Sequence, residues 1–360
     1  MSTKRRLACR SVDISKSGDC VICRHRISLC ALVVLSLSLA GCLTTPSSSP
    51  LEPLTDESLA PEPIRSLGLA IHSLCILSGV YALDGGPTND APVSDERSRS
   101  SRRNGTVRAT WLGHSSMLLD VGGVRILTDP VLADGASLAS PLPPILVRRQ
   151  DRTANLPQLD AVVISHGDYD HLHEPSLRAI ASRFPKATIF LPERLGHLAR
   201  AAGFQRVREV AVGSSSQLGR VVFTALPALH ATRRNIVGIV DGGAVSWEFR
   251  TRSRRVLFVG DTAYGPVFKR IGCQRGPYDL VLVPIGASEP HYFVGDMHIS
   301  PEDAVRLVQD VRAAVAIGIH WGTFALSPEP REAPARRFRK AAAGRIDART
   351  LRIGDSLVLP

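Results

Sequence analysis

One short segment of the sequence contains four side chains able to bind a metal ion within six positions. His166-Gly167-Asp168-Tyr169-Asp170-His171 follows the apolar run 161–165, which is typical of a buried strand. Pro175 and the periodic run 177–184 then predict a helix. Imidazole and carboxylate ligands that alternate in a tight strand-to-helix loop can surround two cations from one side. The alternative is a polar loop whose aspartates cap the helix.

Three further apolar runs lead to candidate ligands. His230 comes after the run 221–226, Asp261 after 255–260 and His320 after 314–319. A single His or Asp in such a place is usually a satisfied polar residue, but the four sites together predict that several strand ends converge. The predicted metal ligands are His166, Asp168, Asp170, His171, His230, Asp261 and His320. Because none of them is Cys, the set suits Zn²⁺, Mn²⁺ or Fe at a dinuclear site.

The strands needed to position these ligands begin at residue 106. Residues 106–111 alternate in polarity, and the runs 117–120 and 124–128 flank Gly122-Gly123. A Gly-Gly pair between two such runs favours a tight β-hairpin.

This order of motifs resembles the metallo-β-lactamase superfamily of metal-dependent hydrolases, whose usual signature is H-x-H-x-D-H followed by His, Asp and His after separate strands. The resemblance covers residues 106–330 and is greatest to the branch that contains N-acylphosphatidylethanolamine-hydrolysing phospholipase D. The segments that carry it are TWLGH at 110–114, LTDPV at 127–131, GDT at 260–262, PIGASEP at 284–290, HISPEDAV at 298–305 and IHWGTF at 319–324.

The resemblance implies an α/β fold, an αββα sandwich of two mixed β-sheets flanked by helices, with the site at one edge. It implies that His166, Asp168 and His230 hold the first metal, that Asp170, His171 and His320 hold the second, and that Asp261 bridges the two. The family has His where this chain has Asp168. We therefore expect two divalent ions, with Zn²⁺ favoured, and Mn²⁺ or Fe also suited to the harder carboxylate donor. A single well-bound metal is the alternative.

The resemblance further implies a phosphodiesterase of the phospholipase D type, in which a hydroxide between the metals attacks phosphorus. Asp261 and Asp170 would act at the reacting centre. His298 would stabilise the leaving group or the phosphate, or else serve only as a helix-entry residue. His291 and Arg233 are candidate substrate-binding residues, and His114 is a weaker candidate. A lactonase or other ester hydrolase is the alternative activity, and a non-catalytic metal- or lipid-binding lipoprotein is the alternative of another class.

The N-terminus predicts an export signal. Residues 1–26 are basic, residues 27–39 are apolar, and Leu39-Ala40-Gly41-Cys42 resembles the bacterial lipoprotein signal, in which Cys42 is lipidated. Leu43 favours retention at the outer membrane, so we expect a lipid-anchored protein of the bacterial cell envelope, on the periplasmic face. The alternative is an ordinary anchor helix. The expected domains are a signal peptide (1–42), a tether and extension (43–105), a hydrolase domain (106–330) and a basic segment that completes it (331–360).

Charge and cysteine usage agree with this organisation. The formal charge is +11, but the leader and the segment 331–360 each carry +5, which favours export and anionic lipid over nucleic acid as the reason for the charge. The expected partners are a phospholipid, or a small phosphodiester or ester substrate, and a membrane that the lipid anchor contacts, with no nucleic acid. Of the seven cysteines, only Cys75 and Cys273 remain in the expected folded part, and we expect free thiols rather than a disulfide.

Overall fold

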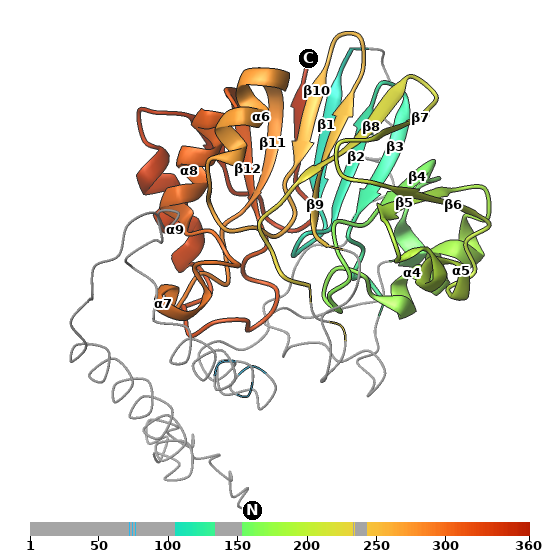
Figure 1. The fold of residues 1–360 in the computed structure, drawn as a ribbon, viewed down its shortest axis with the longest axis horizontal. Coiled ribbons are helices and arrows are strands. Elements are labelled where there is room, and N and C mark those ends of the chain that lie inside the picture. The colour runs from blue at the N-terminus through green and yellow to red at the C-terminus, as the bar shows by residue number, and fades with distance from the viewer. Residues whose placement is uncertain are drawn as a thin grey trace, which may run out of the picture. The chain divides into compact units, whose positions relative to one another are not determined.

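Two seven-stranded sheets form the framework of the computed structural model (Figure 1). The structure describes residues 72, 74, 76, 105–133, 153–232, 234 and 243–360. The first sheet has the strand order β14-β1-β2-β3-β4-β5-β6, and the second has the order β13-β12-β11-β10-β9-β8-β7. Each sheet joins three antiparallel strand pairs to three parallel pairs, so both are mixed sheets.

The elements have the following bounds. The first sheet consists of β1 (Val107–Trp111), β2 (Met117–Val121), β3 (Val124–Thr128), β4 (Ala161–Val163), β5 (Thr188–Pro192), β6 (Arg206–Val210) and β14 (Ser356–Leu359). The second consists of β7 (Ser215–Leu218), β8 (Val221–Pro227), β9 (Val245–Arg250), β10 (Arg255–Phe258), β11 (Tyr278–Pro284), β12 (Ala313–Ile319) and β13 (Asp347–Arg349). The helices are the 3-10 helix η3 (Thr153–Asn155), α4 (Glu174–Arg183), α5 (Gly196–Ala201), α6 (Val267–Arg275), α7 (His291–Val294), α8 (Pro301–Asp310) and α9 (Ala333–Ala342).

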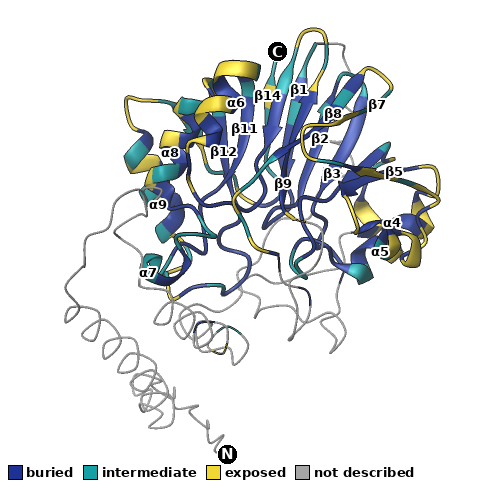
Figure 2. Ribbon diagram, in the orientation of Figure 1, coloured by how far each residue is buried: buried dark blue, intermediate teal, exposed yellow. Residues whose placement is uncertain are grey.

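Helices lie against the outer side of each sheet. Figure 1 shows α4 and α5 beside β5 and β6, and α6, α8 and α9 beside β11 and β12. The exposed residues of these helices face away from the sheets (Figure 2). The inner strands are almost wholly buried, whereas the edge strands β6, β7, β13 and β14 are partly exposed. The prediction of an αββα sandwich of two mixed sheets is confirmed.

The alternation of side chains along the strands explains why two cores form. Ala161 and Val163 of β4 belong to the main core, which also contains Phe223 and Trp247 of the second sheet. Val162 points the other way, into a second core with Leu177 of α4. Successive strand residues face opposite sides of a sheet, so a strand that is apolar throughout needs cover on both faces.

The hairpin and the C-terminal strand complete the first sheet. Gly122 and Gly123 join β2 to β3 with φ of 58° and 83°, a left-handed pair that a two-residue hairpin needs and that glycine adopts without steric cost. After residue 330 come α9, β13 and β14, and β14 pairs antiparallel with β1.

Several sequence predictions fall outside the described residues. They include the signal with Cys42, the tether, Cys75 and Arg233. Cys273 on α6 is an exposed free thiol. In the part of the chain that the structure describes, we find no helix with the length and apolarity needed to cross a bilayer.

Candidate metal centre

The predicted ligands converge from both sheets. The segment 166–171 follows β4 of the first sheet, whereas His230, Asp261 and His320 follow β8, β10 and β12 of the second. All seven side chains therefore meet at the edge where these strands end, as the sequence predicts.

The first group of ligands surrounds Asp168. Its Oδ2 lies 3.5 Å from His166 Nε2 and 3.3 Å from His230 Nε2. Possible ligand atoms of the three residues all lie within 4.8 Å of one another. This is the group that the resemblance assigns to the first metal, and Asp168 occupies the place of the family's His.

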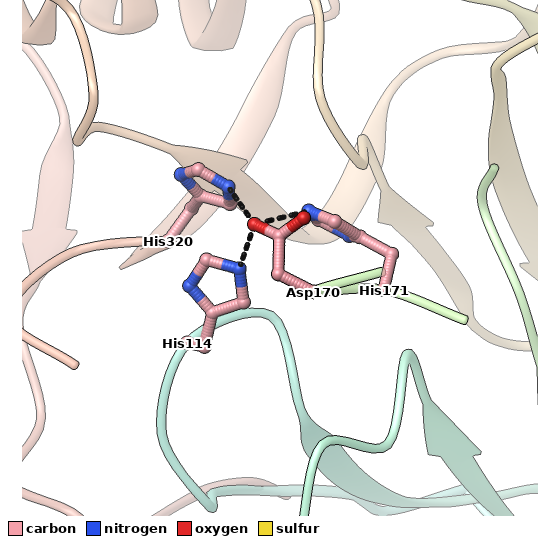
Figure 3. Close-up of side chains that lie close together, drawn as sticks. All are labelled: His114, Asp170, His171 and His320. Atoms are coloured by element: carbon pink, nitrogen blue, oxygen red, sulfur yellow. Dashed lines mark hydrogen bonds and ion pairs between the residues drawn. The ribbon is translucent and has the colours of Figure 1, made fainter. Parts of the chain in front are cut away.

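The second group surrounds Asp170 (Figure 3). Its Oδ2 lies 3.7 Å from His171 Nε2 and 3.9 Å from His320 Nε2. His114, from the turn after β1, brings a third imidazole and forms a hydrogen bond of 3.0 Å between Nε2 and the same oxygen. His114 thus orients the carboxylate that is expected to bind the second metal.

Asp261 lies between the two groups. Its Oδ2 is 3.3 Å from His171 Nε2 and 3.1 Å from His320 Nε2, and it also forms a cluster with His230 and His298. This position matches the bridging role that the resemblance implies.

The donor set leaves buried polar atoms that a cation would satisfy. Among the described residues, His166 Nε2, His171 Nε2, both ring nitrogens of His320 and Asp261 Oδ1 have no hydrogen-bond partner. Each such buried atom costs about 1–3 kcal/mol if it remains unsatisfied. Since imidazole and carboxylate are good ligands for zinc, manganese and iron, the residues fit two divalent cations.

Hydrogen bonds from outside the ligand set fix the ring nitrogens that face the centre. His171 Nδ1 lies 2.7 Å from Asp129 Oδ2. A carboxylate oxygen without a proton can only accept a hydrogen bond, so the proton of this bond is on Nδ1. Ser165 Oγ donates to the same carboxylate and lies 2.8 Å from His166 Nδ1. His230 Nδ1 lies 2.9 Å from the carbonyl of Met297. All three rings therefore carry their proton on Nδ1, and each Nε2 keeps a lone pair for a metal.

Backbone strain accompanies this arrangement. His114 and His320 have φ of 50° and 60°, a region that non-glycine residues rarely adopt. The N–H of His320 donates to the carbonyl of His114 at 3.0 Å, and so does Trp111 Nε1 at 2.8 Å. Strain of about 1–3 kcal/mol per residue persists where surrounding contacts over-determine the backbone, and such sites cluster at functional centres.

The carboxylates and imidazoles of the centre change one another's pKa. Burial alone would lower the pKa of His171, but Asp261 and Asp170 raise it well above its usual value. Burial alone would raise the pKa of Asp261, but His171 and His320 lower it well below its usual range. When no cation is bound, His171 therefore holds an additional proton beside these carboxylates. A metal ion must displace that proton, so metal affinity falls as the pH is lowered.

A cavity of about 180 Å³ opens beside the ligands. Asp168, Asp170, His230 and Asp261 line its polar side, together with His298, whose Nδ1 lies 3.7 Å from Asp261 Oδ2. Its other walls are mainly apolar, and they contain His72 as well as Ile76, Ala231, Ala287, Val294, Met297 and Leu326.

Comparison with known proteins identifies the family. A family model described as "Beta-lactamase superfamily domain" matches residues 124–321. The chain belongs to the metallo-β-lactamase superfamily. It is 38% identical over 240 residues to N-acyl-phosphatidylethanolamine-hydrolyzing phospholipase D 1 of Caenorhabditis elegans, which covers 62% of this chain and 67% of that protein. It is 36% identical over 239 residues to an uncharacterized protein of Mycobacterium tuberculosis, which covers 65% of this chain and 63% of that protein.

A solved structure shares the fold. Igni18, a metallo hydrolase from the archaeon Ignicoccus hospitalis, aligns with a TM-score of 0.54 at 23% identity, over 71% of this chain and 99% of that chain. The fold, the family and the donor set together support a metal-dependent hydrolase.

The predicted substrate residues of this superfamily member lie in different places. His298 lines the cavity, and burial lowers its pKa to about 3, so its imidazole is neutral. His291 begins α7 and does not line the cavity that the described residues form. Arg233 lies outside the described residues. Its neighbour Arg234 is buried and bonds to the backbone of Gly167 and to Glu174.

Two residues of the site were not predicted from the sequence. Asp129 reads as a structural residue before Pro130, yet it is wholly buried and holds His171. His72, from the extension before the hydrolase domain, lines the cavity and bonds to the backbone of Leu326. Its only signal in the sequence is a single His within a mostly apolar stretch.

Proposed function

We propose that this metal-dependent hydrolase is a phosphodiesterase of the phospholipase D type that acts on N-acylphosphatidylethanolamine or related phospholipids. The observation that carries the proposal is the 38% identity to the Caenorhabditis elegans phospholipase, together with the clusters of possible metal ligands at the strand ends of this chain. The site supports metal-assisted hydrolysis in general, and the relative supports the choice of substrate.

Two divalent cations at this centre would lower the pKa of a bound water and stabilise the negative charge that develops on the attacked group. Asp261 is 3% exposed and remains ionised, so its carboxylate can accept a hydrogen bond from an attacking water and orient it. His298 is neutral and faces the cavity, so its ring N–H can donate to a phosphoryl or leaving-group oxygen without a change of charge.

The size of the cavity is consistent with a large amphiphilic substrate of which only the reacting part enters. A volume of about 180 Å³ holds a phosphodiester group and a few neighbouring atoms, whereas sites that enclose a whole small molecule are usually larger, at about 300–1,000 Å³. Acyl chains would lie outside it. Leu229 and Tyr264 are more than a third exposed and adjoin the segments of His230 and Asp261, which gives such chains apolar surface near the site.

We also propose the location and the metal content that the sequence predicts. Cys42 would carry lipid and hold the enzyme at the periplasmic face of the outer membrane, within reach of membrane phospholipids. Zn²⁺ is the expected ion at both sites, and Mn²⁺ or Fe suits the first site because Asp168 is a harder donor than His. If Cys42→Ala still sediments with membranes, lipidation at Cys42 is not the main anchor.

The deciding experiment measures metal content and hydrolysis on one preparation of the full chain in detergent. Bound metal is counted by mass spectrometry, and N-acylphosphatidylethanolamine, bis(p-nitrophenyl) phosphate and a lactone are assayed in parallel. Asp261→Ala, which removes the shared ligand, is the inactive reference, and Asp120→Asn is the control for an unrelated lost carboxylate. Hydrolysis of the lactone alone supports the ester-hydrolase alternative, and no hydrolysis by a metal-loaded protein supports a binding protein.

A further inference from the structure

A single buried arginine connects the ligand loop to the segment that carries His230. Arg234 is 8% exposed. Its Nη1 donates to the carbonyl oxygens of Gly167 at 2.8 Å and Leu172 at 2.9 Å, and its Nη2 donates to Glu174 Oε1 at 2.8 Å. Its guanidinium lies 4.6 Å from the ring centroid of Tyr169.

The two carbonyls mark the ends of the loop. Gly167 lies between His166 and Asp168, and Leu172 follows His171. Inside the loop, the carbonyl of Asp168 accepts hydrogen bonds from the N–H groups of His171 and Leu172 at 3.0 and 2.8 Å. The loop is therefore a tight turn whose two ends are held by one planar group, which limits how far its ligand side chains can move.

The two groups of ligands are supported differently. In the second group, Asp129 holds His171 and His114 holds Asp170. In the first group, Ser165 Oγ and the carbonyl of Met297 fix the rings of His166 and His230. Asp168 comes from the loop, however, and His230 comes from a separate segment, four residues before Arg234. Among the described residues, Arg234 fastens this second segment to the loop backbone beside Asp168.

We propose that Arg234 is the positioning residue of the first metal site. It sets the separation of Asp168 and His230 and thereby makes the affinity of that site depend on a residue that binds no metal. The inference rests on the proposed two-metal function. It predicts that loss of Arg234 weakens the first site about 10–100-fold, the usual effect of removing a group that orients metal ligands, and leaves the second site nearly unchanged.

The chemistry of the guanidinium explains why arginine is needed. Its fixed planar fork can serve two carbonyls and a carboxylate at once, whereas the ammonium of lysine is a compact point charge that cannot span the same acceptors. Arg234→Lys should therefore keep the charge beside Glu174 but still weaken the first site.

The test titrates Mn²⁺ into the metal-free full chain, for wild type, Arg234→Ala, Arg234→Lys and Arg178→Ala. Arg178 pairs with the same Glu174 from an exposed position, which makes it the matched control. Electron paramagnetic resonance distinguishes a coupled pair of Mn²⁺ ions from an isolated ion, and competition with a chelator gives both dissociation constants. We expect wild type and Arg178→Ala to bind two ions tightly. We expect both Arg234 variants to show the isolated-ion signal over a 10–100-fold wider range of concentration.

Every other outcome contradicts either the positioning role of Arg234 or the proposed two-metal function. If both Arg234 variants bind two ions with wild-type affinities, the positioning role is wrong and the proposed function stands. If both sites weaken equally, Arg234 acts on the fold as a whole and the inference is wrong. If Arg234→Ala does not fold, Arg234→Lys decides by the same two criteria. If wild type itself binds fewer than two ions, the proposed two-metal function fails.

Discussion

Replacing Asp129 by asparagine tests whether a buried carboxylate determines which nitrogen of His171 faces the metal. Asp129 is wholly buried and accepts three hydrogen bonds, from Ser165 N at 2.7 Å, Ser165 Oγ at 2.5 Å and His171 Nδ1 at 2.7 Å. An asparagine keeps the shape, and its carbonyl oxygen can still accept from Ser165 N. Its NH₂ group cannot accept from His171, so the ring is driven to the tautomer that carries its proton on Nε2.

The size of the effect follows from the lost contact. A hydrogen bond to a charged group contributes about 1.5–3 kcal/mol. Since that contact also holds a ligand in its binding tautomer, we expect the second metal site to weaken by roughly 10–100-fold, which corresponds to about 1.4–2.8 kcal/mol. The first site should weaken less, because Asp129 reaches its ligand His166 only through Ser165 Oγ.

Chelator competition on wild type, Asp129→Asn and Asp120→Asn measures both dissociation constants. Asp120 pairs with Arg125 on the neighbouring strand and touches no ligand, so it controls for the loss of a carboxylate. Nitrogen NMR of the histidine rings reports the tautomer of His171 directly. Unchanged affinity at both sites, or a His171 that keeps its proton on Nδ1, would refute the reasoning.

Three further predictions concern single residues. Asp168→His should retain two metals and keep or raise hydrolysis with zinc relative to manganese, since it restores the family's ligand; loss of metal would contradict the assignment of Asp168. His298→Gln should lower the rate about 10²–10⁴-fold with metal content unchanged, and normal turnover would remove it from the reaction. Burial lowers the pKa of His72 from 6.5 to about 4. The unfolded chain therefore takes up that proton first as the pH falls, and up to about 3 kcal/mol of stability, full above pH 6.5, is lost on the way to pH 4. Urea unfolding of the metal-free protein at pH 7 and 4.5 should show a smaller difference for His72→Gln than for wild type.

The sequence predicts those site residues whose place in the fold follows from the residues directly before them. An apolar run that ends in His or Asp specifies both a buried strand and the side chain presented at its end, so the convergence of His166, His230, Asp261 and His320 could be predicted. The fold followed from the same runs and from the resemblance.

Contacts that join distant segments could not be read in this way. Asp129 reaches partners 36 and 42 residues later, and Arg234 reaches a loop more than 60 residues earlier. The loop itself is marked by its spacing and residue types, but nothing in the sequence indicates that Asp129 and Arg234 contact it. His72 enters the site from outside the matched family region, so neither the motif order nor the family pattern pointed to it.

The pairing of β1 with β14 affects the order in which the protein can assemble. Thr110 and Ser356 form a side-chain hydrogen bond across 246 residues, and the strands pair along Val107–Thr110. During synthesis, β1 lacks one of its two neighbours until residues 356–359 emerge, and contacts so far apart in sequence form slowly. His114 follows β1 directly and orients Asp170. In a nascent chain, the strand that leads to His114 therefore lacks one of its two neighbours until residues 356–359 have been made.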